Sequence, residues 1–224
     1  MPGIEGGLSG LIADVGAAAS VPLHTVRHPQ PYGALGYYRL GAASGVMAAA
    51  LAANAEIFQF RYAGANLALI YKVQISAGAQ LAATAALAVS IAMTAARAWT
   101  AAGTGGTRIL PAGNSNKMRT SMGTTALSDA GISTTAGLTA GTKTLDALNV
   151  GELAIGIGTG AITTAVGLPL LARTPILDAD GEGQHPLVLA NQEGFVIRNG
   201  SIAWPAAMTW KFAVEVLWGE VTAF

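Results

Sequence analysis

The chain has 224 residues, of which 52% are hydrophobic and only 11% are charged, with no cysteine and a formal net charge of +0. The absence of cysteine excludes disulfides, thiolate metal sites and cysteine nucleophiles. The balanced charge argues against direct binding of nucleic acid, which normally requires a basic excess, and the hydrophobic content argues against intrinsic disorder.

Residues 1–36 are predicted to form an extended N-terminal arm, and residues 37–224 a single β domain. Glycine and alanine dominate the first half of the arm, and prolines interrupt its second half. The spacing of apolar residues favours a short helix within Leu8–Ala19. No lysine or arginine precedes Arg27, which argues against a secretory signal peptide. Such an arm is either a tether that reaches a neighbouring subunit or a terminus without contacts of its own.

Two strands joined by a turn are predicted next. Ile57–Tyr62 alternates between aromatic and polar residues, and Leu67–Ser76 places apolar side chains on one face with Lys72 and Gln74 on the other. The residues Ala63–Asn66 between them are typical of a turn, so the two strands are predicted to form a β-hairpin.

The stretch between Lys72 and Arg97 contains no charged residue and is long enough to span a membrane. We nevertheless predict no membrane span, because the stretch is rich in alanine, carries scattered polar residues and lacks aromatic belts and flanking basic clusters. Within it, Leu87–Trp99 alternates large apolar with small residues. This pattern predicts a strand whose small-residue face lets another sheet or chain approach closely.

The segments between residues 103 and 190 alternate between loops and short strands. Glycine, threonine, asparagine or acidic residues mark the loops, which are Gly103–Asn116, Thr139–Thr144 and Asp178–Pro186. Short strands are predicted in the intervening segments, which are Thr120–Ser133, Glu152–Leu171 (with a loop inside it) and Leu187–Ala190.

The clearest strand lies near the end of the sequence. In Thr209–Val221, five large apolar residues alternate with polar and smaller ones, which is typical of a half-buried antiparallel strand. The dipeptide Asn199-Gly200 after Phe195–Arg198 suits a type I′ hairpin turn. Eight or so short strands at this spacing predict an all-β fold, an antiparallel β-sandwich of jelly-roll kind.

The sequence contains no recognisable catalytic motif. His24 and His28 have the spacing of a helical metal-binding pair, but prolines bracket them and no carboxylate is near, so surface histidines are favoured. The acidic segment Asp178–Glu182 lacks the twelfth-position acid of an EF-hand, which favours a solvated turn over a weak cation site. The glycine-rich Gly156–Gly160 lacks the complete dinucleotide-binding motif. We therefore predict a protein that is not an enzyme and holds no cofactor or metal.

Five strand and turn segments carry a family resemblance: Gly33–Leu40, Met47–Phe60, Lys117–Thr124, His185–Ile197 and the final strand Thr209–Val221. Together, and in this order, they resemble a family of tailed-bacteriophage virion proteins. The resemblance covers most of the chain from about residue 33. It implies a β-sandwich that assembles into oligomers and takes a place on the virus particle.

The function implied by the resemblance is structural. It is that of a decoration or cement protein, a trimer assembled in the host cytoplasm that binds the major capsid protein on the capsid exterior and bridges capsomers. A surface poor in charge also fits burial against other copies or a larger assembly. Two alternatives stay open. The first is a tail, fibre or other minor virion component, and the second is a carbohydrate-binding β-sandwich.

Contacts with partners are expected from aromatic, histidine and basic residues in the arm, at the start of the domain and near residue 118. These candidate interface residues are His24, His28, Tyr32, Tyr37, Tyr38, Lys117 and Arg119. For the carbohydrate-binding alternative, the aromatic candidates are Tyr37, Tyr38, Trp99 and Trp204, because sugars stack on exposed aromatic faces.

Overall fold

In the computed structural model, strands account for nearly all regular structure. The described residues are 35–109, 116–159, 168–179 and 184–223, together with two short strands near the N-terminus, β1 (Ile4–Gly6) and β2 (Leu11–Ala13). The chain divides into two compact units, Met1–Pro31 and Tyr32–Phe224.

In the first unit, β1 and β2 form an antiparallel pair in which Glu5 lies opposite Ile12. The helix predicted within Leu8–Ala19 is therefore wrong for Leu11–Ala13, which is a strand. Glycines surround this segment in the sequence, and glycine weakens a helix by about 1 kcal/mol per residue relative to alanine.

In its described part, the second unit contains strands, turns and loops but no helix, which confirms the all-β prediction. Nothing in the described ranges is a helix long and apolar enough to cross a membrane. The strands are β3 (Gly36–Ala43), β4 (Glu56–Tyr62), β5 (Leu67–Ala79), β6 (Leu87–Ala101), β7 (Thr107–Arg108), β8 (Leu127–Ile132), β9 (Thr142–Leu145), β10 (Gly151–Ile157), β11 (Leu168–Asp178), β12 (Leu187–Leu189), β13 (Glu193–Asn199) and β14 (Trp210–Val221).

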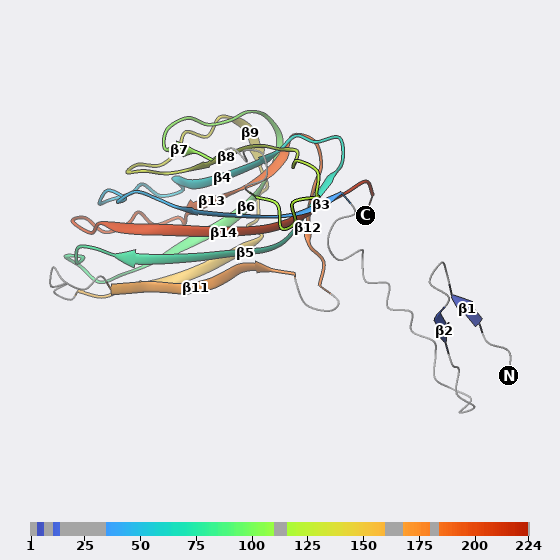
Figure 1. Cartoon of the computed structure of the whole chain (residues 1–224). Coiled ribbons are helices and arrows are strands. Elements are labelled where there is room, and N and C mark those ends of the chain that lie inside the picture. Colours follow the sequence, from blue (N-terminus) through green and yellow to red (C-terminus); the bar gives the residue numbers. More distant parts are fainter. Residues whose placement is uncertain are drawn as a thin grey trace. The chain divides into compact units, whose positions relative to one another are not determined.

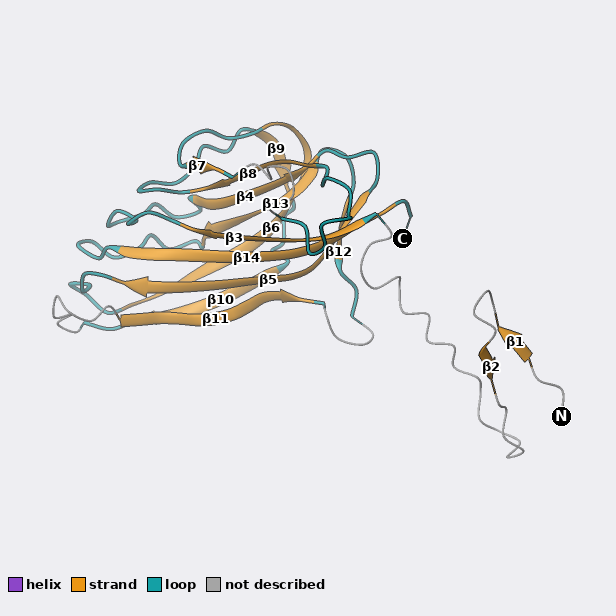
Figure 2. Cartoon of the chain, viewed as in Figure 1, coloured by secondary structure: helices purple, strands orange, loops and turns teal. Residues whose placement is uncertain are grey.

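These strands form two antiparallel sheets that pack face to face (Figures 1 and 2). One is a seven-stranded sheet in the order β10-β6-β13-β4-β8-β7, with β9 paired to β6. The other is a five-stranded sheet in the order β11-β5-β14-β3, with β12 paired to β5. The predicted antiparallel β-sandwich is confirmed.

Strand β14 lies between β5 and β3 in the middle of the five-stranded sheet. Its alternating sequence buries one face as predicted, because no side chain on that face is more than 3% exposed. These side chains are Trp210, Phe212, Val214, Val216 and Trp218. The opposite face of β14 therefore forms part of the outer surface of the sandwich.

Aromatic side chains join the two sheets in the core. The indole of Trp218 stacks on Tyr38 of β3, with ring centroids 5.4 Å apart, and meets Phe60 of β4 edge-on at 5.2 Å. Phe60 in turn stacks on Phe195 of β13 at 5.0 Å. Since β4 and β13 belong to one sheet and β3 and β14 to the other, these rings fix the spacing of the layers.

The predicted hairpin of Ile57–Tyr62 and Leu67–Ser76 is wrong, although both strands exist. Strand β4 belongs to the seven-stranded sheet and β5 to the five-stranded sheet, so Ala63–Asn66 carries the chain from one sheet to the other. The alternating pattern shows which face of a strand is buried, but it does not identify the partner strand.

The predicted type I′ hairpin at Asn199-Gly200 is also wrong. Neither residue has the positive φ that this turn requires. The fully buried Asn199 amide instead donates to the carbonyls of Ala52 at 2.9 Å and Ile202 at 3.0 Å. Asn199 thereby anchors the loop that takes the chain from β13 across to β14 in the other sheet.

The described parts of the remaining segments follow the predictions with small differences, whereas residues 110–115, 160–167 and 180–183 lie outside the described residues. Strand β11 continues to Asp178, beyond the predicted end at Leu171. The ambiguous stretch Leu87–Trp99 is strand β6, as predicted. The predicted loop Gly103–Asn116 contains the two-residue strand β7, and the predicted turn Thr139–Thr144 runs into β9. Strands of two to four residues leave too little alternation in a sequence to be recognised.

The two outer strands of the five-stranded sheet differ in character. Strand β11 contains Pro169 and Pro175, and its pairing with β5 shifts register at several points. The outer edge of β3 is partly covered, because the amide of Arg39 donates to Asn116 at 3.0 Å and the amide of Met118 donates to Tyr37 at 3.1 Å.

Candidate interaction surfaces

The outer face of the five-stranded sheet carries two neighbouring zones of different chemistry. The alternation that buries Trp218 and Phe212 turns Leu217, Glu215 and Ala213 outward. Charged residues gather around Glu215, and small residues gather around Ala213.

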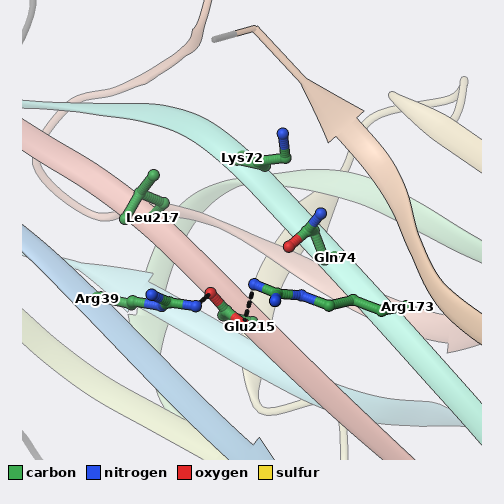
Figure 3. Close-up of a pocket in the computed structure, with 6 residues that line it drawn as sticks. All are labelled: Arg39, Lys72, Gln74, Arg173, Glu215 and Leu217. Carbon is green, nitrogen blue, oxygen red and sulfur yellow. Dashed lines mark hydrogen bonds and ion pairs between the residues drawn. The ribbon is translucent and has the colours of Figure 1, made fainter.

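The charged zone is centred on one carboxylate (Figure 3). Glu215 of β14 forms an ion pair with Arg39 of β3 on one side and with Arg173 of β11 on the other, the latter at 2.6 Å. Lys72 of β5 lies in the same shallow hollow and pairs with Asp178 at 2.8 Å. We call these five residues the charged ledge.

Ion pairs on this ledge contribute little to stability. The side chains of Arg39 and Arg173 are 45% and 59% exposed, and exposed pairs are typically worth about 0–1 kcal/mol. The pairs hold two guanidinium groups in fixed positions with N–H groups left for a partner. Three cationic side chains and two carboxylates give the ledge a small excess of positive charge. The ledge is therefore suited to contact an acidic surface on a partner protein.

Small residues form a second zone on the same face. We call this the small-residue patch, and it comprises Ala43 of β3, Ser76 and Gly78 of β5, Ala213 of β14 and, where the patch meets the charged ledge, Gly41 of β3. A Cβ atom built on Gly41 would meet no atom within 4 Å. The five residues of the patch have no long side chains, although Lys211 lies opposite Gly78 at its border, so another protein surface can approach the backbone of this sheet closely between them.

The structure brings some of the predicted interface residues together. Lys117 forms an isolated β-bridge with Tyr38, so the basic segment lies along the edge of β3 beside Tyr37. Lys117 is half-buried, whereas Arg119 is exposed. His24, His28 and Tyr32 lie outside the described residues.

Tyr38, in contrast, is a core residue. It is 1% exposed, its ring stacks on Trp218, and its hydroxyl donates to the carbonyl of Gly123 at 3.0 Å. Tyr37, on the opposite face of β3, is partly buried and lies 6.1 Å from Tyr71, ring to ring. Of the two, only Tyr37 has surface to offer a partner.

The aromatic candidates for sugar stacking are mostly inside the sandwich. Trp99 and Trp204 are 0% and 2% exposed, and Tyr38 is equally hidden. Trp204 stacks on Trp210 with centroids 3.8 Å apart. Three of the four rings named for a carbohydrate site therefore have no free face.

The acidic segment gives no evidence of a cation site in its described part. Asp178 pairs with Lys72, and residues 180–183 are not among those described. Within the described ranges, no group of three or more histidine, aspartate or glutamate residues is arranged to hold a metal ion.

A buried polar cluster that the sequence did not reveal lies on the outer side of β4, beneath the segment that contains β7 and β9. Glu56 and Gln59 of β4 are 5% and 0% exposed. Oε2 of Glu56 accepts from Nζ of Lys143 at 2.9 Å and from Nε2 of Gln59 at 2.5 Å. Nη1 of Arg108 donates to Oε1 of Gln59 at 3.3 Å and pairs with Asp129 at 3.0 Å. We call these five residues the buried polar cluster.

Burial disturbs the ionisation of this cluster. It lowers the pKa of Lys143, an effect that the hydrogen bond to Glu56 partly offsets. Burial likewise raises the pKa of Asp129, against the opposing charge of Arg108. The ammonium of Lys143 also lies 4.5 Å from the centroid of the Trp99 ring, which is fully buried. For Lys143 and Asp129, burial therefore favours the neutral form more than water does.

Comparisons with known proteins identify no relative, since no family model, no curated protein and no solved structure matches this chain.

Proposed function

We propose that this protein is a virion structural protein of a tailed bacteriophage, a cement or decoration protein that binds the outside of the capsid as a homo-oligomer, most simply a trimer. Its partner is the major capsid protein, and its task is to bridge capsomers. The proposal starts from the resemblance of the five strand and turn segments and draws further support from strand order and surface chemistry.

The strand order supports a jelly roll. Taken in chain order, the eight long strands β3, β4, β5, β6, β10, β11, β13 and β14 form two facing rows, β11-β5-β14-β3 and β10-β6-β13-β4. These rows match the two sheets of an eight-stranded jelly roll, with β7–β9 as an insertion between β6 and β10. Jelly rolls are common in viral capsid proteins and in lectins.

The observation that carries the functional proposal is the outer face of the five-stranded sheet. The small-residue patch allows close approach, and the charged ledge beside it gives the contact an orientation. On a regular lattice, several such contacts made by one oligomer act together, so weak individual contacts give strong binding. A protein that binds only the assembled shell stabilises the shell by mass action.

The N-terminal arm, residues 1–36, enters the proposal as a tether. Its support is the division of the chain into the two units Met1–Pro31 and Tyr32–Phe224. A tether raises the local concentration of the domain at its binding site and so adds to the strength of multivalent docking.

The copy number of the protein in purified particles tests the function directly. A cement protein must be present in numbers comparable with the number of capsomers, as measured by quantitative mass spectrometry of intact virions. A few copies per particle would instead support a tail, fibre or other minor component. Absence from particles would refute both assignments.

A bulky charge on the small-residue patch should abolish capsid binding. In Gly41→Arg, the new Cβ meets no atom within 4 Å and the longer side chain lies opposite Glu215 on the outer face, so the domain should keep its thermal stability while binding to shells falls at least about tenfold, a loss of about 1.4 kcal/mol. Gly156→Arg is a matched control, because Gly156 is an exposed strand glycine with equally open space, on β10 of the other sheet. Equal binding by both variants in a co-sedimentation assay would remove the patch from the interface.

Carbohydrate binding is the weaker alternative. The burial of Tyr38, Trp99 and Trp204 leaves Tyr37 as the one partly exposed ring among the four candidates. Binding of the folded protein to any glycan on an array would revive this alternative.

A further inference from the structure

The buried polar cluster holds an amine and a primary amide on the same carboxylate. Oε2 of Glu56 lies 2.9 Å from the amine of Lys143 and 2.5 Å from the amide nitrogen of Gln59. One carboxylate oxygen thus contacts both nitrogens that would exchange places on the Gln59 carbonyl carbon. The side chains of Lys143 and Glu56 are 2% and 7% exposed, and Gln59 is fully buried, so water has little access.

We propose that Lys143 and Gln59 form an intramolecular amide cross-link between their side chains, with Glu56 as the proton carrier and Arg108 as the group that stabilises the oxyanion. The bond would join β9 to β4 covalently. This inference concerns a chemical modification of the chain and does not depend on the proposed place of the protein on a virion.

The reaction is redox-neutral and needs no co-reactant. Glu56 takes one proton from the Lys143 ammonium, and the free amine attacks Cδ of Gln59 to form the new C–N bond. Glu56 then gives its proton to Nε2 and takes the second proton from Nζ. The Cδ–Nε2 bond breaks, ammonia leaves, and Glu56 passes the last proton to it. Overall, one ammonium group and one primary amide become one secondary amide and one ammonium ion.

The surroundings favour each step. Burial favours the neutral amine, which is the nucleophile, over the ammonium. Negative charge develops on Oε1 of Gln59 during the attack, and Nη1 of Arg108 already donates to this atom at 3.3 Å. A preorganised cationic donor at a developing oxyanion is a common source of rate acceleration. The other hydrogen of Nε2 is held by the carbonyl of Thr139 at 2.7 Å, which fixes the orientation of the amide.

The intact mass of the purified, folded full-length chain tests the proposal. The cross-linked protein weighs less than its sequence requires by one molecule of ammonia, and digestion yields a branched peptide containing Gln59 and Lys143. On a denaturing gel without reductant or metal, the linked chain also runs ahead of the unlinked chain, because the bond closes a loop between the two residues.

Three variants separate the cross-link from ordinary ion pairing. Lys143→Arg keeps a cation beside Glu56 but removes the nucleophile, and Glu56→Gln keeps the shape but removes the proton carrier, so both should show the full sequence mass. Lys72→Arg alters a surface lysine that pairs with Asp178 and should still lose ammonia.

The wild-type protein alone can overturn the proposal, even if the cluster variants fail to fold. A full sequence mass after prolonged incubation of the folded protein would refute it. Loss of water in place of ammonia would assign the carbonyl to Glu56, and deamidation of Gln59 would show that water reacts in place of Lys143. Either result contradicts the proposed bond.

Discussion

Replacing Trp218 by alanine is expected to lower the free energy of unfolding by about 3–5 kcal/mol, the range for removing a large aromatic ring from a packed core. Trp218 is fully buried and contacts both layers, stacking on Tyr38 and meeting Phe60 edge-on. Its removal therefore costs the burial of the indole and leaves a cavity between the sheets. Urea unfolding followed by tryptophan fluorescence and circular dichroism measures the change.

Leu217→Ala provides the matched control for this variant. Leu217 precedes Trp218 on the same strand but points outward onto the charged ledge, where it is only partly buried. Its truncation should cost well under half as much. Equal losses for the two variants would contradict the two-layer packing that places Trp218 at the contact between sheets.

Raising the pH above 10 is expected to destabilise the protein through two buried tyrosines. Burial, reinforced by the negative charge of Glu220, raises the pKa of Tyr38 from 10.0 to about 12. The pKa of Tyr62 is raised by the same two causes and further by Tyr38. Because the folded-state pKa exceeds the unfolded value, the full stability contribution is present below pH 10 and is lost as pH rises from 10 through 12. For Tyr38 alone, a shift of two units corresponds to about 2.7 kcal/mol.

Tyr62→Phe isolates one of these two groups. The Tyr62 hydroxyl is buried and has no hydrogen-bond partner within the described structure, so its loss should cost little at neutral pH. The variant should then lose less stability than the wild type between pH 10 and pH 11.5 in urea unfolding series. Parallel curves for the two proteins would show that Tyr62 does not contribute to the alkaline loss.

Local alternation predicted the strands well and their partners poorly. The pattern around Trp210 and Trp218 identified β14 and its buried face, since a period of two survives in any half-buried strand. The same pattern in β4 and β5 suggested a hairpin, yet the sandwich places these strands in different layers. Strand pairing depends on the order in which the whole chain passes between the two sheets. A short segment of sequence does not indicate that order.

The candidate surfaces could be predicted only in part. Tyr37 and Lys117 do lie together, because the segment around Lys117 pairs with the edge of β3. Gln59 falls on the polar face of β4, which the sequence suggests is solvent-exposed, but the inserted segment containing β7 and β9 covers it completely. Lys143 reaches Glu56 from far along the chain, and no local pattern indicates that contact.

The unequal edges of the five-stranded sheet limit how copies can polymerise. A fibril that grows by edge-to-edge addition needs a strand capable of backbone pairing at both ends of each molecule. Pro169 and Pro175 remove two N–H donors from β11, and its irregular register further weakens that edge as a template. The residues around Lys117 already pair with part of the outer edge of β3. Neither edge of this sheet therefore offers a full-length regular template, so the five-stranded sheet is protected against open-ended growth by strand addition.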